Sequence, residues 1–187
     1  MKAIFRITFS LLAAFLLTGG CGIYTFSGTS IQPDVKTICI EPVVNKATKV
    51  NPSLANQLTE ELNDKFRKLT KLEQVADEED GDLVLDVSVD SYDVRATAVT
   101  ADEVAAMNRL TVTCKVKFEN KLHEEDNLEQ SFASYEDYDS NNSLDMVEGQ
   151  LCETIVKKLA EDIFNATVAQ LEVGGDFPLP SDGIFRR

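Results

Sequence analysis

The sequence has no tryptophan and a single histidine, His123, which lies in an acidic stretch typical of a turn. A lone exposed histidine is a weak candidate for acid–base catalysis. The 187 residues contain no His-Glu-x-x-His pair, no glycine-rich phosphate loop, no Gly-x-Ser-x-Gly and no paired-cysteine metal knuckle. We therefore expect no catalytic residues, no enzymatic activity and no bound cofactor or metal.

Basic residues are also scarce, with 18 Lys and Arg against 32 Asp and Glu. Lys2 and Arg6 belong to an N-terminal segment that we expect to be removed. The remaining chain then has 16 basic and 32 acidic residues, which gives a net charge of −16. A charge of this sign argues against binding to nucleic acid or adsorption to anionic membranes.

The N-terminal apolar run, residues 7–17, is too short to span the roughly 30 Å of a bilayer core as a helix. It follows two basic residues and precedes the small residues Thr18, Gly19 and Gly20, which is the pattern of an export signal. Cys21 follows directly and matches a bacterial lipobox, although Thr18 stands where leucine is commonest. We expect cleavage after residue 20 and an acylated Cys21 carrying diacylglycerol and an N-acyl chain such as palmitate. The alternative is an ordinary signal peptide with an incidental cysteine.

With Cys21 assigned to the lipid, the sequence retains Cys39, Cys114 and Cys152. An odd number of widely spaced cysteines makes a poor disulfide framework. We interpret them as small buried hydrophobic residues, and one disulfide plus a free thiol remains the alternative.

Alternating apolar residues predict strands over residues 35–42, 83–89, 110–118 and 128–138. Asn51, as N-cap, and Pro52, at the first helical position, predict the start of a helix with apolar residues at spacings of three and four. A second apolar stripe predicts a helix over 144–171, which Gly174-Gly175 would end. The order β-α-β-β-β-α predicts an α+β fold, in which two helices pack on one face of a four-stranded, mostly antiparallel sheet.

The sequence therefore divides into a signal peptide (1–20), a lipidated tether (21–34), one domain (35–173) and a tail (174–187) that we expect to be mobile because it contains Pro178 and Pro180 and lacks periodicity.

One segment nearly matches an EF-hand calcium loop, with acidic or amide side chains at Asp137, Asp139, Asn141, Asp145 and Glu148. Asn142 replaces the glycine of the sharp turn, and the preceding residues alternate like a strand, whereas an EF-hand has a helix there. We prefer the interpretation that these residues begin the second helix, and calcium remains the alternative.

Lys115 and Lys117 lie two residues apart on the strand face that points away from the expected core. On so acidic a chain, this local cationic strip could bind phosphate or carboxylate groups of a ligand. The alternative is an ordinary exposed strand face.

The stretch from Cys21 to Ile31 (CGIYTFSGTSI), followed by Val35-Lys36-Thr37-Ile38, resembles the mature start of the lipopolysaccharide-assembly lipoprotein family LptE in its Bacteroidetes-type form. Weaker similarities are Val50-Asn51-Pro52, Asp64-Lys65-Phe66 and the stretch 162–165. The resemblance extends from Cys21 to about Thr167.

The resemblance implies a non-enzymatic outer-membrane lipoprotein that faces the periplasm. Such proteins sit as a plug inside the LptD β-barrel, help that barrel to assemble, and help to deliver lipopolysaccharide to the outer leaflet. Some members bind lipopolysaccharide through basic residues on the sheet, for which Lys115 and Lys117 are the nearest candidates. Two alternatives stay open: a lipid-anchored adaptor of another envelope complex, and a calcium-binding surface lipoprotein.

Overall fold

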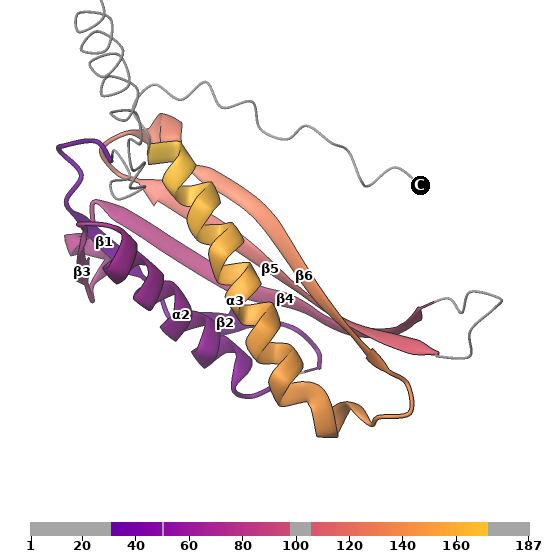
Figure 1. Ribbon diagram of the computed structural model, residues 1–187. Coiled ribbons are helices and arrows are strands. Elements are labelled where there is room, and N and C mark those ends of the chain that lie inside the picture. The colour runs from indigo at the N-terminus through magenta and orange to yellow at the C-terminus, as the bar shows by residue number, and fades with distance from the viewer. Residues whose placement is uncertain (1–30, 50, 98–105, 172–187) are drawn as a thin grey trace, which may run out of the picture.

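A computed structural model describes residues 31–49, 51–97 and 106–171, which form one mixed β-sheet with two helices on the same side (Figure 1). The signal peptide, Cys21, Gly174-Gly175 and the C-terminal tail lie outside the described residues. The elements in chain order are β1 (Thr37–Ile40), β2 (Val44–Asn45), α2 (Leu54–Leu69), β3 (Glu73–Val75), β4 (Leu83–Thr97), β5 (Met107–Asn120), β6 (Leu128–Asp139) and α3 (Leu144–Leu171).

The strands are ordered β3-β1-β4-β5-β6, and β2 also pairs with β4. Strand β1 pairs in parallel with both β3 and β4, and β2 pairs in parallel with β4. The long strands β4, β5 and β6 form an antiparallel meander. The predicted α+β class with two helices on one face is confirmed. The prediction of four strands is wrong, because β2 and β3 were missed. These strands have only two and three residues, so neither is long enough to show alternation.

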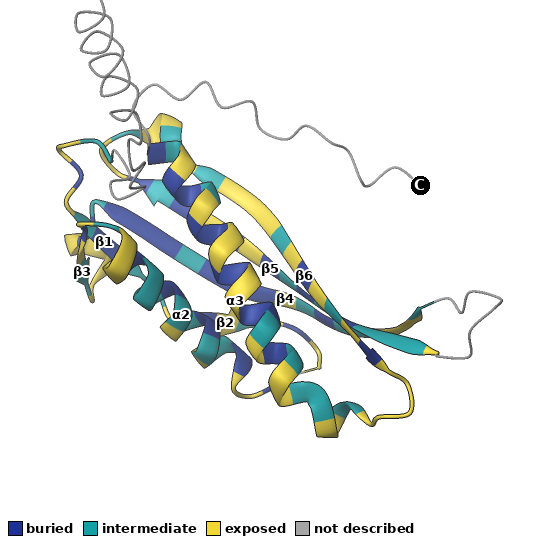
Figure 2. Ribbon diagram, viewed as in Figure 1, coloured by how far each residue is buried: buried dark blue, intermediate teal, exposed yellow. Residues whose placement is uncertain are grey.

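Helix α2 begins at Leu54, two residues later than the sequence predicts. Ser53 occupies the N-cap position, and the side chain of Asn51 accepts hydrogen bonds from Ser53 N (3.0 Å) and Ser53 Oγ (2.7 Å) in the turn before it. Asn51 thus organises the helix start without being the cap. The predicted apolar stripe of α2 is buried against the sheet and α3, except for Leu69, which is exposed (Figure 2).

Strand β4 continues to Thr97, beyond the residues whose apolar alternation is clear. The alternation is interrupted by an irregularity in the strand. Its register against β5 shifts between Val89 and Ser91, which inserts Asp90 as an extra residue. The insertion changes the parity of the strand, so Val89 and Tyr92 both face the helices although they are three residues apart.

Helix α3 spans the residues that the sequence predicts, and its buried side faces β5, β6 and α2. The two helices meet at Phe66 and Phe164, whose rings pack edge to face with centroids 5.0 Å apart. This contact closes the core between the helices.

Gly81 and Asp82 form a tight corner where β1 and β4 begin. One oxygen of the Asp82 carboxylate accepts hydrogen bonds from the backbone N–H of Lys36 (2.9 Å) and of Thr37 (3.0 Å). These bonds hold the pKa of Asp82 below its usual value. A Cβ on Gly81 would lie 2.7 Å from the carbonyl oxygen of Leu83, so the corner has no room for a side chain.

Candidate ligand and partner surface

Lys115 and Lys117 lie on the face of the sheet opposite the helices. Alternate residues of β5 point in opposite directions, and their neighbours Cys114, Val116 and Phe118 are buried in the core. Both lysine side chains are exposed, as the sequence predicts.

Each of these lysines is paired with a carboxylate on the same face. Lys115 Nζ lies 2.6 Å from Glu129 on β6, and Lys117 Nζ lies 3.3 Å from Glu119. The first pair raises the pKa of Lys115 and lowers the pKa of Glu129, because each charge favours the other. The predicted cationic strip is therefore a row of ion pairs.

Arg109 is a third cation on this face, and sequence reasoning missed it. Its guanidinium group donates two hydrogen bonds to the carboxylate of Asp137, at 2.7 and 2.9 Å. The pairing raises the pKa of Arg109 and lowers that of Asp137. The guanidinium group also lies 3.8 Å from the centroid of the half-exposed Tyr135 ring. The sequence did contain a clue to Arg109. It lies an even number of residues before Lys115 and directly before the predicted strand, so extending that strand by one residue places both on the same face.

These three cations define what the face can do chemically. An anionic ligand would compete with a carboxylate at each cation, since Arg109, Lys115 and Lys117 all have partners. A planar guanidinium group binds phosphate through two parallel hydrogen bonds, and lysine binds it as a point charge. The face suits a multiply charged anion with an apolar portion that contacts Tyr135.

The residues of the calcium alternative have separate partners. Asp137 is paired with Arg109 across the β5–β6 ladder, and Asp139 binds Asn141 in the turn before α3. Glu148 accepts a hydrogen bond from Tyr92 on the helix side of the sheet. Within residues 31–49, 51–97 and 106–171, no group of three His, Cys, Asp or Glu side chains is placed to hold a metal ion.

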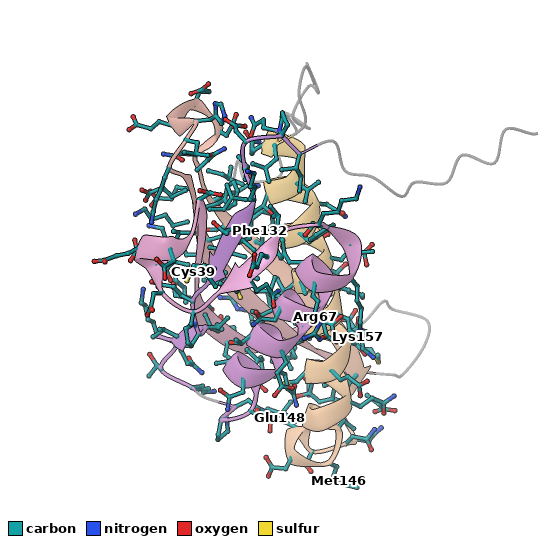
Figure 3. All side chains as sticks on the ribbon, turned by 90° about the vertical axis from the view of Figure 1, so that its left-hand side faces the viewer. Cys39, Arg67, Phe132, Met146, Glu148 and Lys157 are labelled. Carbon is teal, nitrogen blue, oxygen red and sulfur yellow. The ribbon has the colours of Figure 1, made fainter. Side chains whose placement is uncertain are left out.

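Glu148 belongs to a polar cluster between β4 and the two helices. The Tyr92 hydroxyl group lies 3.9 Å from Cys152 Sγ, and the Asn51 side chain donates to the same sulfur at 3.7 Å. Burial raises the pKa of Tyr92 and of Cys152. Glu148 and the exposed Met146 both lie near the beginning of α3 (Figure 3). The cluster ties this end of α3 to β4 and to the start of α2.

The three remaining cysteines, Cys39, Cys114 and Cys152, are buried and unbridged. They therefore act as core residues, as the sequence suggests. Burial raises the pKa of Cys114 to about 12.

His123 lies in the turn between β5 and β6 and is only partly exposed. Its Nε2 atom lies 2.9 Å from the Asp34 carboxylate, which lowers the pKa of Asp34. Gln32 also donates to Asp126 of this turn at 2.7 Å. These contacts fix the start of the described chain at the β5–β6 turn.

The fold is a two-helix α+β domain of a type that also occurs in bacterial lipoproteins. An uncharacterized lipoprotein B from Nitrosomonas europaea shares the fold, with a TM-score of 0.51 and 10% identity over 72% of this chain and 83% of that chain. A minor lipoprotein from Acinetobacter baumannii is also similar, with a TM-score of 0.45 and 16% identity over 72% of this chain and 94% of that one.

A family model described as "LptE: Lipopolysaccharide-assembly" matches residues 35–167. The chain therefore belongs to the LptE family, a structural lipoprotein family not known to have catalytic activity. Membership implies association with the lipopolysaccharide-assembly machinery of the bacterial envelope. No curated protein matches the chain. Among the described residues, no helix combines the length and apolar character needed to cross a membrane.

Proposed function

We propose that this protein is a lipid-anchored, non-catalytic outer-membrane subunit of the lipopolysaccharide-assembly machinery. The observation that carries the proposal is the family match over residues 35–167. In this proposal the chain faces the periplasm, plugs an LptD-type β-barrel and helps it to assemble, and takes part in inserting lipopolysaccharide. The stretch from Cys21 to Ile31 supports a Bacteroidetes-type member.

The proposed anchor constrains how the domain meets the membrane. Residues 1–20 are removed, and Cys21 carries the diacylglycerol and N-acyl chains. Each buried methylene contributes about 0.8 kcal/mol of membrane affinity, so several acyl chains hold the protein firmly. Gln32, which contacts the β5–β6 turn, is eleven residues after Cys21. A fully extended chain of that length spans at most about 40 Å, so the β5–β6 turn stays near the membrane.

Lipopolysaccharide carries phosphate groups and acyl chains, and the cations and apolar surface of the open sheet face would complement both. Arg109, Lys115 and Lys117 supply three cations, and Tyr135 supplies apolar surface beside Arg109. We propose that the phosphates displace Glu129, Glu119 and Asp137 from these cations when lipopolysaccharide binds.

Conditional depletion tests the proposed function. Loss of the protein should lower the amount of lipopolysaccharide at the cell surface, and wild-type protein should restore it. Cys21→Ser should not restore it and should not incorporate labelled palmitate. Unchanged surface lipopolysaccharide after full depletion would contradict the proposal.

The ligand face has its own test. Lys115→Gln combined with Lys117→Gln should weaken binding of purified lipopolysaccharide, measured by fluorescence competition. Lys157→Gln is a matched control, because Lys157 is an exposed lysine paired with Glu153 on α3, away from the sheet face. Equal binding by all three proteins would exclude the lysines but leave the proposed function intact.

A further inference from the structure

Strand β6 lies at the edge of the sheet formed by the long strands. It has 12 residues, and in the described part of the chain its only partner strand is β5. A long edge strand presents unpaired backbone N–H and C=O groups, which can pair with a strand of another chain. Most β6 residues are exposed or half-buried, as Figure 2 shows.

The pairing with β5 identifies which backbone groups point outward. Ser140 N donates to Ala106 O, and the register then runs without a shift from Met107↔Asp139 to Phe118↔Leu128. Hydrogen-bonded pairs alternate along an antiparallel ladder. The even-numbered residues of β6 therefore bond to β5, and the odd-numbered residues point their N–H and C=O groups outward. Among the described residues, nothing hydrogen-bonds the backbone of the central three, Ser131, Ala133 and Tyr135.

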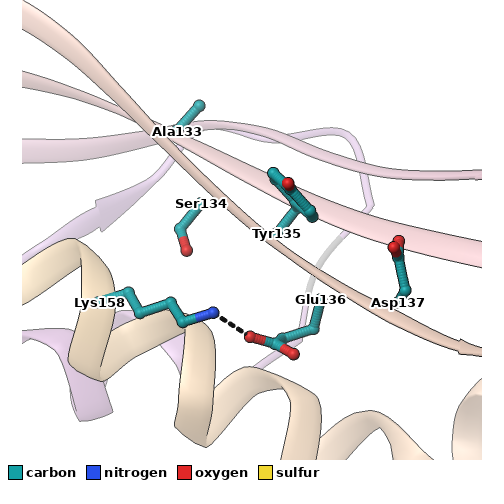
Figure 4. A pocket seen from close by; sticks show the side chains of 6 residues that line it. All are labelled: Ala133, Ser134, Tyr135, Glu136, Asp137 and Lys158. Atoms are coloured by element: carbon teal, nitrogen blue, oxygen red, sulfur yellow. Dashed lines mark hydrogen bonds and ion pairs between the residues drawn. The ribbon is translucent and has the colours of Figure 1, made fainter.

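Open space lies along this part of β6. A depression of about 370 Å³ is lined by residues 133–137 and by Lys158 of α3. Figure 4 shows Lys158 reaching across it to Glu136, with which it forms an ion pair. The depression gives room for side chains of an added strand between the β6 edge and α3.

The charges of β6 select the occupant. The strand contains Glu129, Glu136, Asp137 and Asp139 but no lysine or arginine. Antiparallel pairing with a second copy would bring two acidic strands together, and like charges on paired strands are destabilising. A second copy is also repelled by the net charge of −14 on the full sequence.

A basic segment meets no such repulsion. Arg109, Lys115 and Lys158 already contact three of these carboxylates from the β5 and α3 sides. A carboxylate has about four acceptor positions, so it can also accept hydrogen bonds from a cation on the open side. We propose that the free edge of β6 binds an extended, basic segment of a partner protein, which adds a strand to the sheet beside Ser131, Ala133 and Tyr135.

Amide hydrogen exchange by NMR tests this proposal on the full mature protein in detergent micelles. The probe is a synthetic peptide of about eight residues that alternates lysine with threonine. The outward amides of Ser131, Ala133 and Tyr135 should exchange fast in the free protein and become protected when the peptide is added. The inward amides of Phe132 and Ser134 should be protected in both states.

Four controls separate strand addition from simple charge attraction. Ala133→Pro removes an outward N–H without removing a bond to β5, and it should raise the peptide Kd at least about tenfold. Ala133→Val keeps the N–H and should bind like the wild type. A peptide N-methylated at alternate residues, and one with glutamate in place of lysine, should both bind at least about tenfold more weakly.

Several results would overturn the proposal. One is the absence of peptide-induced protection of the outward amides, and another is equal binding by the N-methylated peptide. Protection that depends on protein concentration without peptide would show pairing between two copies. If Ala133→Pro does not fold, the N-methylated peptide on wild-type protein still decides the question.

Discussion

The corner at Asp82 allows a quantitative prediction, because one side chain joins the beginnings of two strands. Asp82→Ala removes the carboxylate oxygen that accepts the backbone N–H groups of Lys36 and Thr37. These bonds fix the start of β1 against the start of β4, so the substitution should destabilise the whole sheet rather than one loop.

The magnitude follows from the two bonds. A hydrogen bond to a charged group contributes about 1.5–3 kcal/mol when it is shielded from solvent. Lys36 N is exposed, so water replaces part of the loss at that site. We expect Asp82→Ala to lower the free energy of unfolding by about 1–3 kcal/mol. In a domain of this size, each kcal/mol lowers Tm by about 2–4 °C.

Urea unfolding followed by circular dichroism measures the effect, and its pH dependence tests the cause. The pKa of Asp82 is lower in the folded state than in the unfolded state, where it is about 3.9. The carboxylate therefore stabilises the fold fully above that pH, and its contribution is lost as pH falls through the folded-state pKa. The difference between wild type and Asp82→Ala should be largest near neutral pH and shrink in acid.

Asp80→Ala is the matched control. Asp80 is two residues before Asp82 and its side chain is exposed, so the substitution removes the same charge outside the corner. It should change the unfolding free energy by less than about 0.5 kcal/mol. Equal stability of Asp82→Ala and Asp80→Ala at pH 7 would refute the reasoning, as would a difference that persists unchanged at low pH.

Three further stability predictions follow from the packing. Gly81→Ala should destabilise by about 1–3 kcal/mol in urea unfolding because its Cβ meets Leu83 O, whereas Gly149→Ala, which has open space around it, should not destabilise. Phe66→Ala should cost about 3–5 kcal/mol, far more than Leu69→Ala at an exposed position, and equal losses would contradict the assigned core. Iodoacetamide at pH 8 should modify Cys114 only as the protein unfolds, because burial raises its pKa to about 12; rapid labelling of the native protein, read by mass spectrometry, would contradict this.

The sequence was sufficient to predict the long elements and the fold class. Helix α3 and the three long strands have more than ten residues each, which is enough for their periodicity to be clear. The short strands β2 and β3 form because neighbouring strands provide hydrogen-bonding partners, and this tertiary effect leaves no local pattern. The irregularity at Asp90 likewise hides Tyr92 from a search for strict alternation.

The candidate surface was predictable only in part. Alternation placed Lys115 and Lys117 on the open face, but their carboxylate partners depend on the β5–β6 register. Glu129 is next to Lys117 in that register, yet it binds Lys115 on the diagonal. Asp137 shows the same limit, because its local spacing fits the calcium alternative, whereas its ion pair with Arg109 depends on the β5–β6 register. Contacts between strands require the register, which no single segment encodes.

The most direct test of the central claim is affinity purification of the full, lipidated protein from outer membranes solubilised in mild detergent. We predict that one very large β-barrel protein co-purifies at a one-to-one ratio, as measured by quantitative mass spectrometry, and that Cys21→Ser recovers less of it. Recovery of the protein without any large barrel, or with a different envelope complex at a fixed ratio, would contradict the proposed role.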